Sequence, residues 1–293
     1  AYTGGNHLAV DWKDEDDTGI KFRFGCQTSL FGQFRTQLED GIMGLSMDSP
    51  SYWSQMHDAG RLKAFQFSLC FTKAPTATRQ GTGAGAMIMG GTDTRLHTTP
   101  MVYATQISTE TQFYSLQLER MYLRMGGGES VLSNSDDAVR HNVVIKTDDL
   151  NAGGLIVDSG TSTTLLTEKL LEPFKAAWKR VTGKDYDEDF LEVTHEELMA
   201  LPTILFQFTP WSEINDQSLP GVTGESIDPS HPNSILVAFP PSHYFSYLPA
   251  RGTYVSHVFF RVKKGKTQTL GANFLMGKDV HFDLEKNRIG FSE

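Results

Sequence analysis

GGLIVDSGTSTTLL, residues 153–166, places an acidic residue at the end of an apolar run. Leu155–Val157 predict a buried strand, and Asp158 follows at once in a tight Asp-Ser-Gly turn. A carboxylate in this place is costly unless hydrogen bonds satisfy it, and the hydroxyls of Thr161 and Ser162 are suited to donate them. Such donors also set the pKa and the orientation of an acid. The pattern therefore predicts a functional carboxylate.

Composition and charge exclude several classes of protein. The 293 residues are 39% hydrophobic, which is enough to bury the core of one large or two moderate domains. The formal net charge of −9 and the pI near 5.5 argue against a nucleic-acid binder, which would present a basic face. No run of about 18 apolar residues is present, so no transmembrane segment is expected. No secretory signal is visible, and the opening AYTGG, without an initiator Met, is typical of the interior of a longer protein.

The hydrophobic pattern is mainly that of short strands separated by turn residues. A helical period is clear in TEKLLEPFKAAWKRV (167–181), where Thr167 is a suitable N-cap, and shorter helices are expected at 51–59 and 195–201. The segment at 72–86 is small and polar and predicts a loop. Strands are expected at 21–25, 64–71, 86–89, 113–123, 154–157, 203–208, 235–239, 254–262, 279–283 and 288–291.

Several common site motifs are missing. HEELM at 195–199 lacks the second histidine of a zinc motif, and GTGAGA at 81–86 lacks the strand and helix that flank a phosphate loop. No GxSxG elbow occurs. Cys26 and Cys70 lack CxxC spacing, so a structural disulfide and two inert buried thiols both stay open, while a catalytic cysteine is disfavoured. No metal and no cofactor is expected.

A second Asp-Thr-Gly triplet occurs at Asp17, in DDTGI, but its surroundings differ. Asp17 follows the charged run WKDED and precedes Ile20 and Lys21, so a turn between two edge strands accounts for it. Asp158 instead follows three apolar residues. Only the stretch around Asp158 predicts catalysis.

This stretch resembles the second active-site motif of the pepsin-like aspartic peptidases, two apolar residues followed by Asp-Ser/Thr-Gly-Thr/Ser. In that family an apolar-apolar-Gly element in each lobe threads the active-site loop into a ψ shape. The chain has two such elements, one in Ile42-Met43-Gly44 and one ending in Leu270-Gly271. Further segments resemble the family in order, so that the resemblance covers nearly the whole chain: FGCQ (24–27), FSLCF (67–71), MIMGGTDTRLHTTPMVY (87–103), FYSLQLERMYL (113–123) and LPTILFQF (201–208).

The resemblance implies an all-β, bilobal, pepsin-like acid protease fold with a few short helices. It also implies two catalytic aspartates, one in each lobe, and Asp17 fits poorly as the first. It lies 27 residues before Gly44, whereas 113 residues separate Asp158 from Gly271. The sequence is therefore expected to be N-terminally incomplete and to begin after the first motif.

On this interpretation residues 1–100 form a partial N-terminal lobe and residues 101–293 form the C-terminal lobe with Asp158. The start of the sequence then falls where the family has its flap, which makes Tyr2 the flap candidate. Gly44, Leu270 and Gly271 are expected to support the ψ loops.

By the same resemblance the full-length protein is an aspartic endopeptidase in which Asp158 and a second carboxyl activate a water, without a cofactor or a covalent intermediate. Ser159 is expected to bond the turn of the other lobe, Gly160 to allow the tight turn, and Thr161 to bond the outer oxygen of Asp158. The given chain alone is expected to be inactive, because the second carboxyl is missing from it.

Substrates by resemblance are extended polypeptides with apolar side chains, bound between the lobes of a monomer in the secretory pathway, a vacuole or lysosome, or outside the cell. Nucleic acid is not an expected partner. One alternative stays open, a catalytically inactive, protease-derived binding or inhibitor protein with the same fold. A one-motif homodimer of retroviral type is disfavoured because two apolar-apolar-Gly elements are present in one chain.

Overall fold

The computed structural model divides the chain into two compact units, residues 1–65 and 66–293, each with its own internal packing. The residues that the structure describes are 7–10, 20–25, 29, 41–47, 50–72, 85–107, 113–125, 130, 140–142, 147–188, 190–211, 223 and 227–293.

The N-terminal unit contains, in its described part, a two-stranded antiparallel sheet and one helix. β1 (His7–Val10) pairs with β2 (Phe22–Gly25), and α1 (Tyr52–Asp58) follows. Ser51 caps α1, because its hydroxyl accepts the backbone N–H of Ser54. Trp53 on α1 is fully buried. The predicted helix at 51–59 is confirmed.

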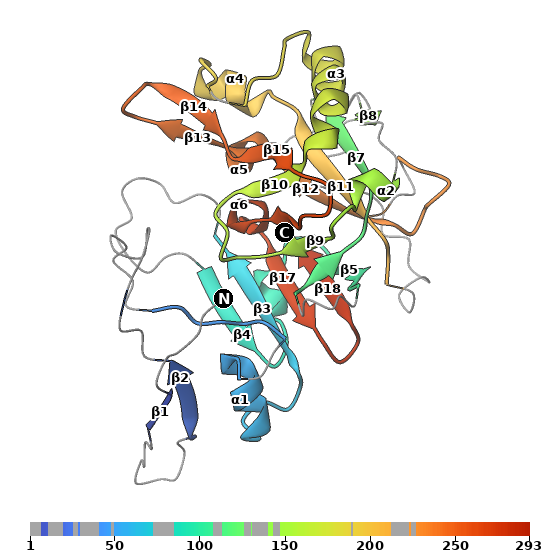
Figure 1. Ribbon diagram of the computed structural model, residues 1–293. Coiled ribbons are helices and arrows are strands. Elements are labelled where there is room, and N and C mark those ends of the chain that lie inside the picture. The colour runs from blue at the N-terminus through green and yellow to red at the C-terminus, as the bar shows by residue number, and fades with distance from the viewer. Residues whose placement is uncertain are drawn as a thin grey trace. The chain divides into compact units, whose positions relative to one another are not determined.

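The C-terminal unit is built, as far as its described residues go, on two five-stranded sheets, a four-stranded sheet and a hairpin (Figure 1). One five-stranded sheet is antiparallel throughout, and in it the last two strands of the chain pair with strands from the beginning of the unit. The order in this sheet is β4 (Gly85–Met89), β3 (Gln66–Phe71), β17 (Asp279–Asp283), β18 (Arg288–Ser292) and β5 (Val102–Thr105).

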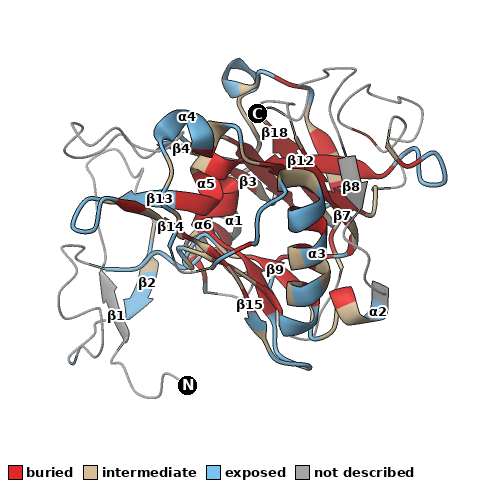
Figure 2. Cartoon of the chain, turned by 90° about the horizontal axis from the view of Figure 1, so that it is seen from above, coloured by how far each residue is buried: buried red, intermediate tan, exposed pale blue. Residues whose placement is uncertain are grey.

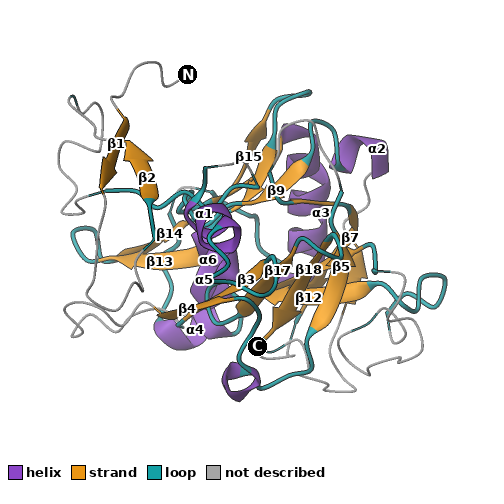
Figure 3. Cartoon of the chain, turned by 90° about the horizontal axis from the view of Figure 1, so that it is seen from below, coloured by secondary structure: helices purple, strands orange, loops and turns teal. Residues whose placement is uncertain are grey.

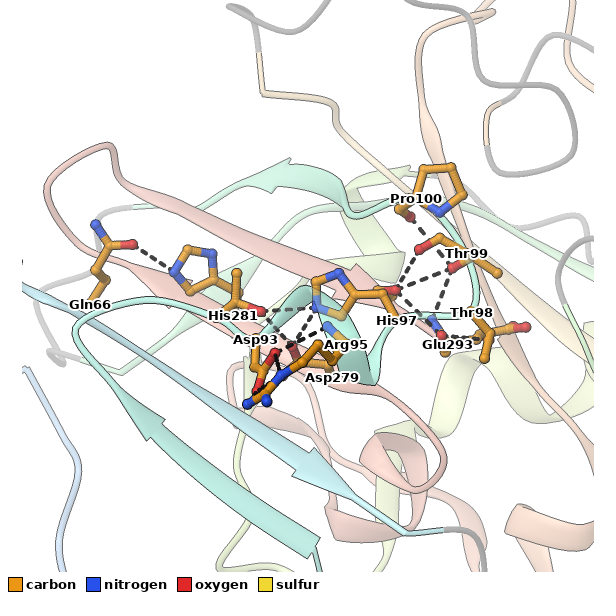
Figure 4. Close-up of polar contacts among 12 residues, drawn as sticks. Gln66, Asp93, Arg95, His97, Thr98, Thr99, Pro100, Asp279, His281 and Glu293 are labelled. Carbon is orange, nitrogen blue, oxygen red and sulfur yellow. Dashed lines mark hydrogen bonds and ion pairs between the residues drawn. The ribbon is translucent and has the colours of Figure 1, made fainter.

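The two faces of this antiparallel sheet differ in polarity, because successive side chains of a strand point to opposite faces. One face is apolar and buried, with Phe67, Val280, Phe282, Ile289 and Phe291. The other face carries buried polar side chains in hydrogen bonds (Figure 4). On that face Asp279 accepts from Thr92 at 2.6 Å and from His97 at 2.7 Å, and His281 lies within hydrogen-bond distance of Gln66 (2.9 Å) and Tyr103 (3.1 Å).

The second five-stranded sheet contains the strand that precedes Asp158. Its order is β15 (Val258–Val262), β10 (Thr164–Thr167), β16 (Gln268–Leu270), β9 (Leu155–Val157) and β6 (Ser115–Leu116). β9 runs parallel to β16 and β10 runs parallel to β15, whereas β10 and β16 are antiparallel. This mixed pairing brings segments from distant parts of the chain together beside the loop that carries Asp158.

The remaining described strands and most of the helices are short, and strands predominate over helices (Figure 3). The four-stranded sheet has the order β12 (Ile235–Phe239), β11 (Thr203–Phe208), β7 (Leu118–Arg124) and β8 (Arg140–Asn142), and the hairpin is β13 (Phe245–Leu248) with β14 (Thr253–Ser256). The helices of this unit are α2 (Thr147–Leu150), α3 (Leu171–Thr182), α4 (His195–Met199), α5 (Pro241–Tyr244) and α6 (Ala272–Leu275), with 3-10 turns at η2 (Thr94–Leu96) and η3 (Glu168–Leu170).

α3 packs one apolar stripe inward and leaves its other side exposed (Figure 2). Phe174 and Trp178 on this helix are buried and contact the rings of Tyr186 and Phe260 at centroid distances of 4.6–5.0 Å. Thr167 caps η3, since its hydroxyl accepts the N–H of Lys169, and α3 follows directly. The helical period predicted over 167–181 is therefore confirmed, with a 3-10 first turn.

The predicted fold class is confirmed at the level of a mainly β protein with a few short helices. Two predicted strands are interrupted, at Gln117 between β6 and β7 and at His257 between β14 and β15. The predicted loop at 72–86 falls almost wholly outside the described residues. In the part of the chain that is described, each helix is too short or too polar to cross a bilayer. The lobe boundary near residue 100 and the incompleteness of the N-terminal lobe stay predictions.

Candidate active site

Asp158 directly follows β9, whose side chains Leu155–Val157 are all buried. The backbone N–H of Asp158 donates to the carbonyl of Leu270 on β16 at 3.0 Å, which extends the parallel pairing of the two strands by one residue. The Asp158 side chain is only half-buried. The sheet therefore fixes the backbone at this position and leaves the acid accessible to water.

Both oxygens of the Asp158 carboxylate accept hydrogen bonds from their own loop. The backbone N–H of Gly160 donates to Oδ1 at 2.9 Å, and the hydroxyl of Thr161 donates to Oδ2 at 2.7 Å. A carboxylate has about four lone-pair sites, so each oxygen can accept a further bond from a water or from a protonated acid. Ser159 beside it is exposed. The arrangement fixes the plane of the carboxylate and leaves each oxygen able to accept one further hydrogen bond.

β16 lies between β9 and β10, which are the two arms of the Asp158 loop. Beyond β16 the chain stays against the loop, because the N–H of Ala272 donates to the carbonyl of Thr161 at 2.7 Å. Gly271 makes the closest approach: a Cβ on it would lie 2.5 Å from the carbonyl oxygen of Thr161 and closer still to that of Thr163. Only glycine fits there without a shift of the backbone. Leu270 and Gly271 thus contact the loop directly.

The first apolar-apolar-Gly element has a different environment. Gly44 lies in the N-terminal unit, and within the described residues the segment 41–45 belongs to no strand. Ile42 and Met43 are 72% and 52% exposed, whereas Leu270 on β16 is 0% exposed. Three further residues of the sequence analysis, Tyr2, Asp17 and Cys26, lie outside the described residues, so what was expected of them stays a prediction.

Cys70 on β3 is half-buried. Asp279 on β17 lies directly opposite, so the two side chains share the polar face of the antiparallel sheet. Burial raises the pKa of the Cys70 thiol, and the negative charge of Asp279 adds to the effect. Because the thiolate is the reactive form, a raised pKa argues against a nucleophilic role. A pairing with Cys26 stays a prediction.

Three residues that the sequence analysis did not single out meet at the end of the Asp158 loop. The hydroxyl of Thr164 donates to Oδ1 of Asn273 at 2.9 Å, and the amide of Asn273 donates to the carbonyl of His257 at 3.0 Å. Thr164 and Asn273 are 0% and 5% exposed. They are 109 residues apart in the chain, so no local pattern could have joined them. Among the described residues, no group of three side chains is placed to hold a metal ion.

The family model for eukaryotic aspartyl proteases matches residues 15–293. The chain belongs to this family. The match includes β9, the Asp158 loop and β16, so the resemblance that the sequence suggested is confirmed. Membership of the eukaryotic aspartyl proteases implies polypeptide substrates. Of the curated proteins compared with the chain, none matches it.

Proposed function

We propose that this chain is part of an aspartic endopeptidase in which Asp158 is one of two catalytic carboxyls. The observation that carries the proposal is the accessible carboxylate at the end of β9, held by Gly160 at one oxygen and by Thr161 at the other. A fixed, hydrogen-bonded acid that still faces water is what general acid–base catalysis requires. Membership of the aspartyl protease family supplies the class of reaction.

The proposed reaction uses water as the nucleophile. One carboxylate of the pair takes a proton from the water as the water oxygen attacks the carbonyl carbon of the peptide. The other carboxyl is protonated and gives its proton to the carbonyl oxygen, so a neutral tetrahedral diol forms. The leaving nitrogen then takes a proton from the first carboxyl, and the C–N bond breaks as the diol returns a proton to the second. The two carboxyls titrate as a pair, because they share a proton.

The second carboxyl, on this proposal, comes from a motif that precedes Tyr2 in the full-length protein. The charged run WKDED that precedes Asp17 in the sequence supports this, because it does not have the apolar pattern of a buried strand. The exposure of Ile42 and Met43 also supports a preceding segment. If that segment covered these two apolar side chains, their burial would stabilise the fold. We assign residues 1–100 to the N-terminal lobe and 101–293 to the C-terminal lobe. Gly44 would support the first ψ loop, Tyr2 the flap, and Ser159 a bond between the two active-site turns.

The proposed substrates are extended polypeptides with apolar side chains near the scissile bond. We place the enzyme, as a monomer, in the secretory pathway, a vacuole or lysosome, or outside the cell. These proposals rest on family membership.

The function is tested by hydrolysis of an unfolded protein at acid pH by the full-length protein. Asp158→Asn keeps the size of the side chain but removes the ionisable group, so kcat is expected to fall about 10²- to 10⁴-fold. Pepstatin-type mimics of the transition state are expected to block the wild type. Asp185→Asn is the matched control, because Asp185 is exposed and bonds only Lys179 in the described contacts, at 2.8 Å.

Retained hydrolysis in the Asp158→Asn protein would overturn the assignment. If the full-length wild type bound peptides but hydrolysed none, the alternative of a protease-derived binding or inhibitor protein with the same fold would be favoured.

A further inference from the structure

Asn273, in the first turn of α6, uses both ends of its side-chain amide inside the protein. Its Oδ1 accepts the hydroxyl of Thr164 at 2.9 Å, and its Nδ2 donates to the carbonyl of His257 at 3.0 Å. The side chain is 95% buried. A buried polar group with both its donor and its acceptor in use fixes the segments that it joins.

The first of these segments is the end of the Asp158 loop. Thr164 begins β10, and its hydroxyl oxygen also accepts the N–H of Gly271 at 3.4 Å. The residue between Gly271 and Asn273 is Ala272, whose N–H donates to the carbonyl of Thr161. Thr161 in turn donates to the Asp158 carboxylate. Two hydrogen bonds, from Ala272 to Thr161 and from Thr161 to Asp158, therefore connect the backbone beside Asn273 to the proposed catalytic acid.

The second segment is the start of β15. The carbonyl of His257 accepts from Asn273 and also from the N–H of Thr164 at 2.9 Å. β10 and β15 run parallel from this point, with Thr164 opposite Val258. Asn273 thus ties α6, the start of β10 and the residue before β15 together at the end of the Asp158 loop.

We propose that Asn273 is a positioning residue of the active site. Its amide holds the start of β10 and the segment 271–273 at a fixed spacing, and this spacing sets the place of Thr161 and the plane of the Asp158 carboxylate. Asn273 itself bonds neither the substrate nor Asp158. The inference rests on the proposed catalytic role of Asp158.

Asn273→Asp tests the proposal, because the new side chain has nearly the same shape. A protonated aspartic acid can accept from Thr164 and donate to the His257 carbonyl, as the amide does, whereas the ionised form only accepts. The variant is therefore expected to match wild-type kcat within about twofold at pH values that keep this acid protonated. As the pH rises and the acid ionises, kcat is expected to fall about 10- to 100-fold below that of wild type, with KM nearly constant.

Asn151→Asp is the matched control. Asn151 makes the same pair of bonds, accepting the N–H of Leu118 at 2.9 Å and donating to its carbonyl at 2.8 Å, but it precedes β9, at the opposite end of that strand from Asp158. After correction for the fraction of folded protein, the kcat of Asn151→Asp is expected to depend on pH as that of the wild type does. Asp158, His257 and Lys278, the other ionisable groups in the segments around Asn273, are present in all three proteins, so their own titration is common to the three pH profiles.

Hydrogen exchange gives a readout that does not depend on activity. The N–H groups of Asp158 and Ala272 bond β16 and the loop, so their protection in Asn273→Asp is expected to fall about 10-fold at neutral pH and to return in acid, while Asn151→Asp leaves it unchanged. Unchanged protection and an unchanged pH profile in Asn273→Asp would overturn the positioning role. A wild type that hydrolyses nothing, with protection lost as described, would overturn the proposed function and keep the positioning role.

Discussion

Gly271 shows, at the scale of single residues, how closely the backbone is packed beside the Asp158 loop. The carbonyl oxygens of Thr161 and Thr163 occupy the space that a side chain would take. Gly160 donates its N–H to the Asp158 carboxylate, and a Cβ on Gly160 would lie 3.1 Å from Oδ1 of Asp158. The geometry of the carboxylate thus depends on two positions without side chains.

Gly271→Ala is expected to lower the free energy of unfolding by about 2–3 kcal/mol, because the added methyl group forces the backbone away from both carbonyl oxygens. Urea titration followed by tryptophan fluorescence measures this. Gly183→Ala is the comparison: Gly183 ends α3 with a φ of 71° and open space around it, so only the left-handed backbone opposes the change, at about 1 kcal/mol. If Gly271→Ala lowered the free energy of unfolding no more than Gly183→Ala does, the packing argument would be contradicted.

The sequence predicted the local part of this site, and the family resemblance added Leu270 and Gly271 beside it, whereas Thr164 and Asn273 were missed. Asp158, Gly160 and Thr161 are three neighbours in one turn, so their mutual hydrogen bonds follow from the local pattern. Asn273 and Thr164 are joined only through tertiary pairing of β10, β15 and β16, which a single sequence does not reveal.

At the scale of elements, length affects what could be predicted, although a short strand such as β9 was also expected, from its apolar run before Asp158. α3 spans twelve residues and β11 spans six, and both were expected from their periodicity. β10, β13 and β16 have three or four residues each and were not predicted. Segments so short often carry too little pattern to be recognised, and their pairing partners in the sheet hold them in place.

Phe174→Ala is expected to lower the free energy of unfolding by about 3–5 kcal/mol, because it removes a fully buried ring from the cluster with Trp178, Tyr186 and Phe260. The same urea titration measures it. Arg180→Ala on the exposed side of α3 is the control, expected to stay within about 0.5 kcal/mol of wild type. Similar losses for both variants would show that α3 does not anchor this part of the core.

At the scale of the whole molecule, buried ionisable groups link stability to pH. Burial would raise the pKa of Asp228, but hydrogen bonds from Ser230, Gln207 and His231, with the charge of Arg120, outweigh it and hold this pKa below its usual value. Burial also lowers the pKa of His281 and of His257. For all three, the unfolded chain takes up the proton first as the pH falls. Each therefore stabilises the fold at neutral pH, and acid removes that contribution.

The burial of His281 was not evident from the sequence. DVHFD at 279–283 alternates charged and apolar residues, a pattern typical of a strand with one side in water. In the structure His97 bonds Asp279 and Gln66 bonds His281 (Figure 4). Thr92, just before η2, also bonds Asp279, and Tyr103 also bonds His281. The alternating sequence pattern predicts that Asp279 and His281 face water. Segments distant in the chain pack over them, so this face of β17 is a buried polar layer.

His281→Asn is expected to flatten the pH dependence of stability just below pH 6.5. Burial lowers the pKa of His281 in the folded protein, with Asp283 only partly offsetting the effect, so the unfolded chain, near its ordinary pKa of 6.5, takes up this proton first as the pH falls. The wild type therefore loses stability as the pH falls through this range, and the variant loses less. Urea titrations between pH 7.5 and about pH 5 measure the slope of the free energy of unfolding against pH. This slope does not change if the missing ring destabilises the variant equally at every pH.

His195→Asn, at the exposed start of α4, should keep the wild-type slope. Parallel stability curves for His281→Asn and the wild type would show that the buried imidazole is not the source of the acid sensitivity.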